Sequence, residues 1–378
     1  MRSADPRAAP EPADAAGANQ GEADLRNLVA SPFVGATYRV GRLSLGLAYF
    51  TPFGGQSAWE RNERFESVTR YPGAVDGVQR WYSIEGILRS SYPSAASAWS
   101  FGSVSAGLSV SAVETVASTL RARTEAGDDD VRNESRSWLD ASGWAPSFGA
   151  GVTVEPLERT LRLGLSYQAR PNLDGEVRAR GHLRTVLPIG SRDDNAVDFH
   201  TNLPDIVRAG VTYQPSPEVA LRAFGDVTRW SVLQDQCVTR RGARCDVRAD
   251  GSAGPGVIQN QRRDWHDTFG VRLGASYWTS PDLELFVGGG FASNAVPDAT
   301  LEPALPDWNT VSAAAGASAL VAGRLRVTPT WTQILYLSRD TSGKSIHPDL
   351  LPPSRGPSSS GRYSQQLGVL DVNVDYAF

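Results

Sequence analysis

Few side chains in this sequence could carry chemistry, and those that could are scattered. Histidine could act as a base or bind a metal, but no two of the four histidines have the spacing of zinc ligands. The four are His182, His200, His266 and His347. The acidic run 128–130 could attract a cation, although such a run is more often a solvated loop. Because the sequence has no nucleophile elbow, phosphate loop or metalloprotease helix, we predict no enzyme activity, no metal and no cofactor.

The two cysteines, Cys237 and Cys245, fall close together in one polar stretch. They could be two free thiols or a disulfide that ties a loop in an oxidising compartment. A lone close pair outside the cytosol usually oxidises, so we predict the disulfide.

The elements that position these residues are predicted to be β-strands. Residues 269–291 show the strand pattern most clearly. From 269 to 277 every second residue is apolar or aromatic, and the residues between them are small or charged. Turn residues follow at 278–282, and the alternation then resumes from 283 to 291. A period of two places the two sets on opposite faces of a sheet. Because the pattern recurs along the chain, we predict an all-β fold, a transmembrane antiparallel β-barrel with an apolar outer band and a polar lumen.

The same pattern predicts roughly thirteen strands, with short turns alternating with long polar loops as in outer-membrane barrels. We assign a turn to residues 93–97 and a loop to residues 181–202. Bacterial barrels use even strand numbers, and the first predicted strand starts at the outer side, so we expect one of fourteen strands to lie upstream. On this interpretation residues 1–30 are a disordered remnant of the first outer loop, and residues 31–378 form the barrel.

Composition argues against several other classes of protein. A net charge of −4 gives no electrostatic support for nucleic-acid binding. No run of about 18 apolar residues exists, so no transmembrane helix is predicted. The 37 glycines, 10 tryptophans and 11 tyrosines, with a single methionine, suit strands, turns and aromatic girdles rather than a helical bundle. No apolar signal-peptide core follows Met1.

Several short segments, in this order and spacing, resemble the FadL-type family of outer-membrane long-chain fatty-acid and aromatic hydrocarbon transporters. The resemblance covers nearly all of 31–378. The segments include Leu203-Pro204-Asp205, Tyr213-Gln214-Pro215, Thr228-Arg229-Trp230-Ser231, Trp265 to Gly274, Ser293 to Pro297 and the terminal Tyr376-Ala377-Phe378.

The resemblance implies a fourteen-stranded barrel in the bacterial outer membrane, plugged by an N-terminal hatch. Such a barrel would bind a long-chain fatty acid or other hydrophobic small molecule and release it sideways through a gap beside a kinked strand. The implied surroundings are outer-membrane lipid and lipopolysaccharide, and the implied state is a monomer. The sequence departs from the family in lacking the hatch and in having a short, acidic outer loop at 121–137.

Side-chain parity along the predicted strands assigns candidate ligand contacts in the lumen. The aromatic candidates are Phe50, Phe101, Phe224, Trp230 and Phe286. Packing of the lumen against a plug is the alternative role for each of them. Arg208, Arg222 and Arg272 could hold a carboxylate, but salt bridges with lumen acids such as Asp226 and Glu284 are the better supported use.

The stretch from Gly86 to Pro93 is the candidate for the kinked strand, with an ordinary strand end as the alternative. Taken together, these observations predict outer-membrane transport of hydrophobic solutes by binding in the barrel. The alternatives are a non-specific porin and, with less support, an outer-membrane lipid hydrolase.

Overall fold

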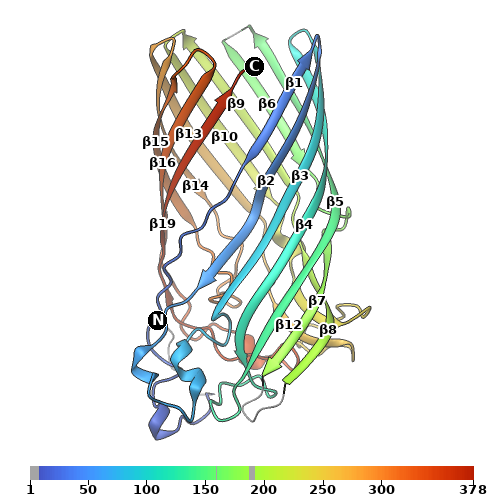
Figure 1. Cartoon of the computed structure of the whole chain (residues 1–378), viewed down its shortest axis with the longest axis vertical. Coiled ribbons are helices and arrows are strands. Elements are labelled where there is room, and N and C mark those ends of the chain that lie inside the picture. Colours follow the sequence, from blue (N-terminus) through green and yellow to red (C-terminus); the bar gives the residue numbers. More distant parts are fainter. Residues whose placement is uncertain (1–7, 159, 187–191) are drawn as a thin grey trace.

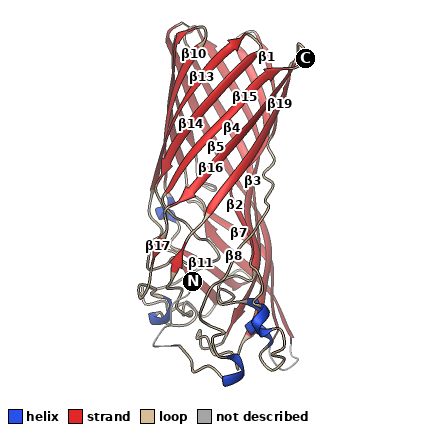
Figure 2. Ribbon diagram, turned by 90° about the vertical axis from the view of Figure 1, so that its left-hand side faces the viewer, coloured by secondary structure: helices blue, strands red, loops and turns tan. Residues whose placement is uncertain are grey.

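The computed structural model describes residues 8–158, 160–186 and 192–378, and nearly all of its regular structure is β. Long tilted strands curl into a tall barrel, with loops and short helical turns gathered at the end away from the C-terminus (Figures 1 and 2). No helix among these residues is both long enough and apolar enough to cross a membrane.

In the described part of the chain, thirteen antiparallel strands form the barrel wall, each paired with the next around it. In order around the wall they are β1 (Val34–Val40), β2 (Leu43–Ala58), β3 (Glu85–Phe101), β4 (Val104–Arg123), β5 (Ser135–Leu157), β6 (Leu161–Gln168), β9 (Ile206–Ser216), β10 (Val219–Thr228), β13 (Thr268–Ser280), β14 (Leu283–Ala292), β15 (Thr310–Leu320), β16 (Leu325–Tyr336) and β19 (Gln366–Tyr376). This agrees with the thirteen strands expected from the sequence.

A second tier of strands extends one side of the wall beyond the ends of β6 and β9. The outer half of β5 pairs with β7, which pairs with β8, then β11, then β12. Their bounds are β7 (Glu176–Val186), β8 (Arg192–Asn202), β11 (Asp235–Arg240) and β12 (Val257–Arg262). A small separate pair is β17 (Arg339–Asp340) with β18 (Arg362–Tyr363). Five 3₁₀ turns complete the described elements: η1 (Ala13–Ala15), η2 (Glu63–Phe65), η3 (Pro72–Asp76), η4 (Trp230–Val232) and η5 (His347–Asp349).

Two predicted connections are wrong. Residues 93–97 are not a turn, because β3 continues through them and turns only at Gly102, whose positive φ of 68° suits glycine. Pro93 is tolerated inside β3 because it faces no partner on β4, so its missing N–H costs no ladder hydrogen bond. Residues 181–202 are not one loop either, since the end of β7 and all of the described part of β8 lie there.

The apolar face of the wall looks outward. Leu47, Leu108 and Leu273 are 66%, 66% and 62% exposed, far more than isolated surface leucines in a water-soluble sheet with a core face. Their strand neighbours Gly46, Gly107 and Gly274 lie on the lumen side. This arrangement is that of a sheet surrounded by lipid, with small residues facing the lumen.

Among the described residues, no backbone pairing joins β1 to β19, although these are the first and last strands of the wall. Both strands finish at the short-turn end, so they run in the same direction (Figure 1). The free edges of β1 and β19 carry backbone N–H and C=O groups that lipid cannot hydrogen-bond. One strand antiparallel to both would pair with these groups. We call this place the seam.

Residues 8–20 are packed rather than disordered, which corrects the expectation for this part of 1–30. Ala15 and Ala18 are buried against a cluster from the outer loop between β2 and β3 that contains Phe65 and Tyr71. The Glu11 carboxylate accepts hydrogen bonds from the backbone N–H groups of Gly17 and Asn19. Small side chains with satisfied backbone groups can therefore pack closely here, although the composition suggests disorder.

Candidate solute cavity

A cavity of about 2350 Å³ fills the outer half of the barrel, and its walls are mixed. Apolar and aromatic lining residues include Phe53, Leu88, Leu139, Phe199, Leu203, Trp230, Leu233, Val238, Trp265 and Trp308. Polar lining residues include Ser90, Thr115, Arg121, Ser137, Thr201, Gln236, Gln259, Arg263 and Glu302. The volume exceeds the 300–1,000 Å³ typical of small-molecule sites, so there is room for a long solute. The lining also reaches the seam, at Leu28 and at 367–370 of β19.

Outer loops form a roof over the cavity. Val78 and Tyr82 come from the loop between β2 and β3, Leu301 from the loop before β15, and Ser359 from the loop before β18, and all four are buried. The Ser359 hydroxyl donates to the Leu301 carbonyl at 2.7 Å, and the Tyr82 hydroxyl donates to the Pro357 carbonyl. The roof is therefore cross-linked by hydrogen bonds between loops that are far apart in sequence.

One buried ion pair lies where the roof meets the cavity. Arg263 Nη1 lies 2.5 Å from Glu302 Oε1, and the two side chains are 6% and 1% exposed. Arg263 Nε also donates to Gln236 Oε1 at 2.8 Å, and the Ala304 N–H donates to Glu302 Oε2 at 2.7 Å. Each buried charge is thus paired and hydrogen-bonded, as a low-dielectric site requires.

Arg121 adds a second cation to this part of the wall. Its guanidinium donates to Gln261 Oε1 at 3.2 Å and to Gln259 Oε1 at 2.7 Å, which are neutral acceptors. With Arg263 and Glu302 it gives this side of the cavity two positive groups for one negative group.

Two apolar clusters border the cavity, and Leu301 of the second cluster also belongs to the roof. The first contains Tyr92, Val113, Ala145 and Val177 of β3, β4, β5 and β7 and Leu203 just after β8, with Phe50 and Phe53 of β2 packed against it. The second, on the opposite side, contains Leu233, Trp265, Ala295, Val296 and Leu301, with Trp230, Leu305 and Tyr363 packed against it. Phe53 and Trp230 meet edge-to-face, with ring centroids 5.3 Å apart.

A bulge in β2 explains how Phe50 and Phe53 both face inward although they are three residues apart. The register of β2 against β3 shifts between Phe50, opposite Tyr92, and Phe53, opposite Ser90. The extra residue lies in Thr51-Pro52, where proline cannot donate to a ladder. Phe50 packs on Tyr92 with centroids 5.5 Å apart, while Phe53 lines the cavity. Strict alternation would place Phe53 on the lipid face, so parity along the sequence misses it.

Of the eight predicted ligand contacts, Trp230 lines the cavity, and Phe50 packs against the first apolar cluster outside the lining. Phe224 and Phe286 face the lumen in the periplasmic half, where their rings cover Gly210 and Gly316. The predicted inward orientation of Phe101 is wrong. It shares the outward face of β3 with Trp99, near the short-turn end, and is 61% exposed. The register of β3 from Ser90 to Ser100 places the even residues inward, and Phe101 is odd.

The three predicted arginines also lie in the periplasmic half, outside the cavity lining. Arg222 Nη2 lies 3.4 Å from Glu284 Oε1, and Arg272 Nη1 pairs with Asp226 Oδ1. Arg208 stands opposite Asp226 in the β9–β10 register. The salt-bridge use of Arg222 and Arg272 is therefore confirmed. The polar groups that do line the cavity, such as Arg121 and Glu302, have no distinctive sequence spacing that would have singled them out.

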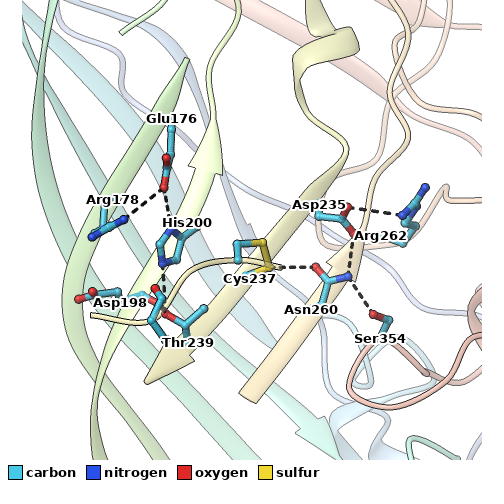
Figure 3. Close-up of a disulfide and its surroundings, with 12 residues drawn as sticks. Glu176, Arg178, Asp198, His200, Asp235, Cys237, Thr239, Asn260, Arg262 and Ser354 are labelled. Carbon is cyan, nitrogen blue, oxygen red and sulfur yellow. Dashed lines mark hydrogen bonds and ion pairs between the residues drawn. A yellow bond between two sulfur atoms is a disulfide. The ribbon is translucent and has the colours of Figure 1, made fainter. Parts of the chain in front are cut away.

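Cys237 of β11 and Cys245 of the following loop are disulfide-bonded, with Cα atoms 5.7 Å apart (Figure 3). The buried Asn260 lies beside Cys237 and donates to Asp235 Oδ1 at 2.8 Å and to Ser354 Oγ at 2.9 Å. On the other side, His200 bonds Glu176 at 2.8 Å and Thr239 at 3.1 Å. The disulfide therefore ties its loop to the second tier of strands. Asn260 of β12, in the same tier, is hydrogen-bonded to Ser354 in the loop before β18.

Comparison with known proteins agrees with this architecture. The profile of the family described as outer membrane protein transport protein (OMPP1/FadL/TodX) matches residues 7–328. A Pseudomonas aeruginosa FadL homologue has a TM-score of 0.68 at 14% identity, covering 91% of this chain and 76% of that one. The Pseudomonas putida toluene transporter TodX has a TM-score of 0.58 at 14% identity, covering 92% and 82%. The CymD monoaromatic hydrocarbon channel has a TM-score of 0.59 at 13% identity, covering 94% and 85%.

Comparison with curated protein sequences finds no significant match. The family profile nevertheless spans most of the chain, and the folds of the solved structures agree with it. The lipid-facing wall, the sorted loops and the large cavity are all consistent with that assignment. This chain therefore belongs to the OMPP1/FadL/TodX family of transport proteins and is an outer-membrane β-barrel.

Proposed function

We propose that this protein carries long-chain fatty acids, or hydrophobic solutes of similar size, from the outer face of the outer membrane into its cavity and then sideways into the bilayer. The observation that carries the proposal is the large cavity, part apolar and part cationic, inside a lipid-facing barrel. TodX and CymD are described as a toluene transporter and a monoaromatic hydrocarbon channel, which supports the hydrophobic class of solute.

The polar side of the cavity favours an acid over a plain hydrocarbon. Arg121 donates only to glutamine oxygens in the contacts described above, so a carboxylate beside it would replace neutral acceptors by a charged one. The acyl chain would then lie along Leu88, Leu139 and Phe199. Burying it would contribute about 0.8 kcal/mol per methylene.

Sideways release is supported by the irregular region of β2 and β3 beside the first apolar cluster. Tyr92 and Pro93 have no partners on β4, and Thr51-Pro52 shifts the β2–β3 register on the other side. β3 thus lacks partners on β4 at Tyr92 and Pro93, and the bulge of β2 lies opposite the adjacent Ser91. The structure contradicts the alternative of an ordinary strand end, because Pro93 lies in the middle of β3.

Binding by the detergent-solubilised full chain tests the proposal. We expect saturable, enthalpically detectable binding of oleate, weaker binding of the uncharged oleyl alcohol, and a further loss of oleate affinity in Arg121→Gln. Phe286→Ala, which changes a lumen ring outside the cavity, is the matched control and should bind oleate normally. Equal binding of acid and alcohol would overturn the fatty-acid part, and preference for toluene would favour an aromatic solute. Absence of binding together with steady ion and sugar conductance would indicate a porin.

A further inference from the structure

The segment that the Cys237–Cys245 disulfide closes is rich in arginine, and we call this segment the disulfide ring. Its three arginines are Arg240, Arg241 and Arg244, and all of them are exposed. The whole chain has a net charge of −4, so the cationic ring is a local departure from its composition.

Polar contacts hold the disulfide ring against the outward face of β7 and β8. Arg241 Nη2 donates to the Gly181 carbonyl at 3.1 Å, and Arg241 Nε lies 3.6 Å from Asp198 Oδ1. The Gly242 N–H donates to Asp198 Oδ2 at 2.9 Å. Asp198 is buried, so its charge is neutralised within this contact. In Figure 1 the yellow loop between β11 and β12 projects sideways from the barrel beside β7 and β8.

The outward face of β7 continues the cationic surface. Arg178, Arg180 and Arg184 lie on this exposed face, while the residues that alternate with them are buried or half-buried. Arg178 lies 3.7 Å from Glu176, and Arg184 lies 3.4 Å from Asp194. Three arginines of the combined surface have no ion pair among the described residues, namely Arg180, Arg240 and Arg244.

This surface begins where the lipid-facing band ends on the side of the outer loops. Trp144 and Phe148 of β5 face outward and are 60% and 40% exposed, as expected for an aromatic girdle at the membrane interface. β7 pairs with β5 from Ser142 outward, and Ser142 stands opposite Arg180. Arg180 therefore lies beside β5 just beyond Trp144. At such a girdle the surroundings of a barrel change from acyl chains to lipid headgroups.

Acidic residues of the same outward face lie farther from the membrane or are already paired. Asp140 lies beyond Ser142 toward the outer end of β5, and Asp194 stands opposite Arg184 near the outer end of β7. Glu176 is closer to the membrane, but its carboxylate contacts an arginine and a histidine. The unpaired charge next to the membrane is therefore positive.

We propose that Arg180, Arg240 and Arg244, with Arg178 and Arg241 beside them, bind the phosphate groups of lipid A, the glycolipid anchor of lipopolysaccharide, in the surrounding outer leaflet. Guanidinium groups bind phosphate bidentately, and each arginine at an anionic membrane surface strengthens binding by about fivefold. The disulfide holds the ring arginines in place before the lipid arrives, which lowers the entropy cost of binding. The proposal does not depend on which solute the cavity carries.

The test measures the affinity of bisphosphorylated lipid A for the detergent-solubilised full chain. The patch variant is Arg180→Gln/Arg240→Gln/Arg244→Gln. The matched control is Arg39→Gln/Arg42→Gln/Arg324→Gln, which removes the same charge from exposed arginines at the short-turn end. Heat-modifiable mobility identifies correctly folded protein for both variants.

We expect the patch variant to lose about a hundredfold in affinity, since three arginines contribute about fivefold each, and the control to stay within about twofold of wild type. Wild type should bind lipid A that lacks phosphate as weakly as the patch variant binds the bisphosphorylated form. Its affinity for the bisphosphorylated form should also fall at about 1 M salt, because exposed charges are screened.

An equal loss of affinity in the two triple variants would overturn the proposal, and so would equal binding of lipid A with and without phosphate by wild type. Oleate binding provides the comparison with the cavity. If the patch variant loses oleate and keeps lipid A, the surface attracts the anionic solute and the proposal is wrong. If wild type binds lipid A through the patch but does not bind oleate, the lipid surface stands and the proposed solute is wrong.

Discussion

The Glu302 carboxylate holds the roof to the cavity wall through a buried charge. It is 1% exposed and pairs with Arg263, while the Ala304 N–H donates to its other oxygen. Arg121 and His347 also lie within its electrostatic reach. Glu302 is therefore the counter-charge for a group of basic side chains that water reaches poorly.

Glu302→Gln removes the charge and keeps nearly the same shape and hydrogen-bonding capacity. Arg263 would then be a buried cation without a counter-ion, and breaking a buried pair in this way costs about 3–5 kcal/mol. Glu155→Gln is the matched control, because Glu155 pairs with Arg162 at the short-turn end with side chains 35% and 63% exposed. Loss of such a surface pair costs about 0–1 kcal/mol.

Limited proteolysis of the outer loops under increasing urea measures the difference, because the roof should open before the barrel wall unfolds. We expect Glu302→Gln to shift loop cleavage to markedly lower urea while the mobility of the barrel is unchanged. The reasoning would be refuted if the glutamine variants at 302 and 155 shifted cleavage equally.

Three further predictions concern single features of the structure. Burial lowers the pKa of His347 from its ordinary 6.5 to about 4, against the pull of Glu302, so the unfolded roof binds the extra proton first. Roof stability should therefore fall as pH drops from about 6.5 to 4, by about 3 kcal/mol in all, and His347→Gln should abolish that slope in proteolysis against pH. The Tyr92 hydroxyl is buried and has no hydrogen-bond partner among the described residues, so Tyr92→Phe should leave thermal stability unchanged or raise it by about 1 kcal/mol. Tyr49→Phe, which loses a hydroxyl that donates to Ser91 at 3.0 Å, should lower it; the reverse order of the two variants would contradict this reading. Reduction of the Cys237–Cys245 disulfide, or a Cys237→Ser/Cys245→Ser double variant, should increase hydrogen exchange in 241–256 and spare the wall, and unchanged exchange there would show that the loop is held by its other contacts.

Much of the wall follows from the sequence because its information is local. The alternation of Leu273 with Gly274, repeated along the chain, specifies both strand and lipid-facing side. Glycine at 41, 102 and 323 adopts positive φ in the short turns, and two of these three turns could be placed from the sequence. The third, at Gly102, was missed because Pro93 and the small residues after it imitate a turn.

The cavity was decided by tertiary structure. A one-residue bulge at Thr51-Pro52 reverses parity beyond it, and only pairing with β3 reveals the bulge, so Phe53 could not be placed from its own neighbours. The partners Arg263 and Glu302 lie in separate loops, and their meeting depends on how the roof folds over the barrel. Periodicity thus determined which face of each strand meets lipid, because that choice needs only adjacent residues. The height at which the lumen is closed, and by which side chains, depended on contacts across the barrel that no local pattern records.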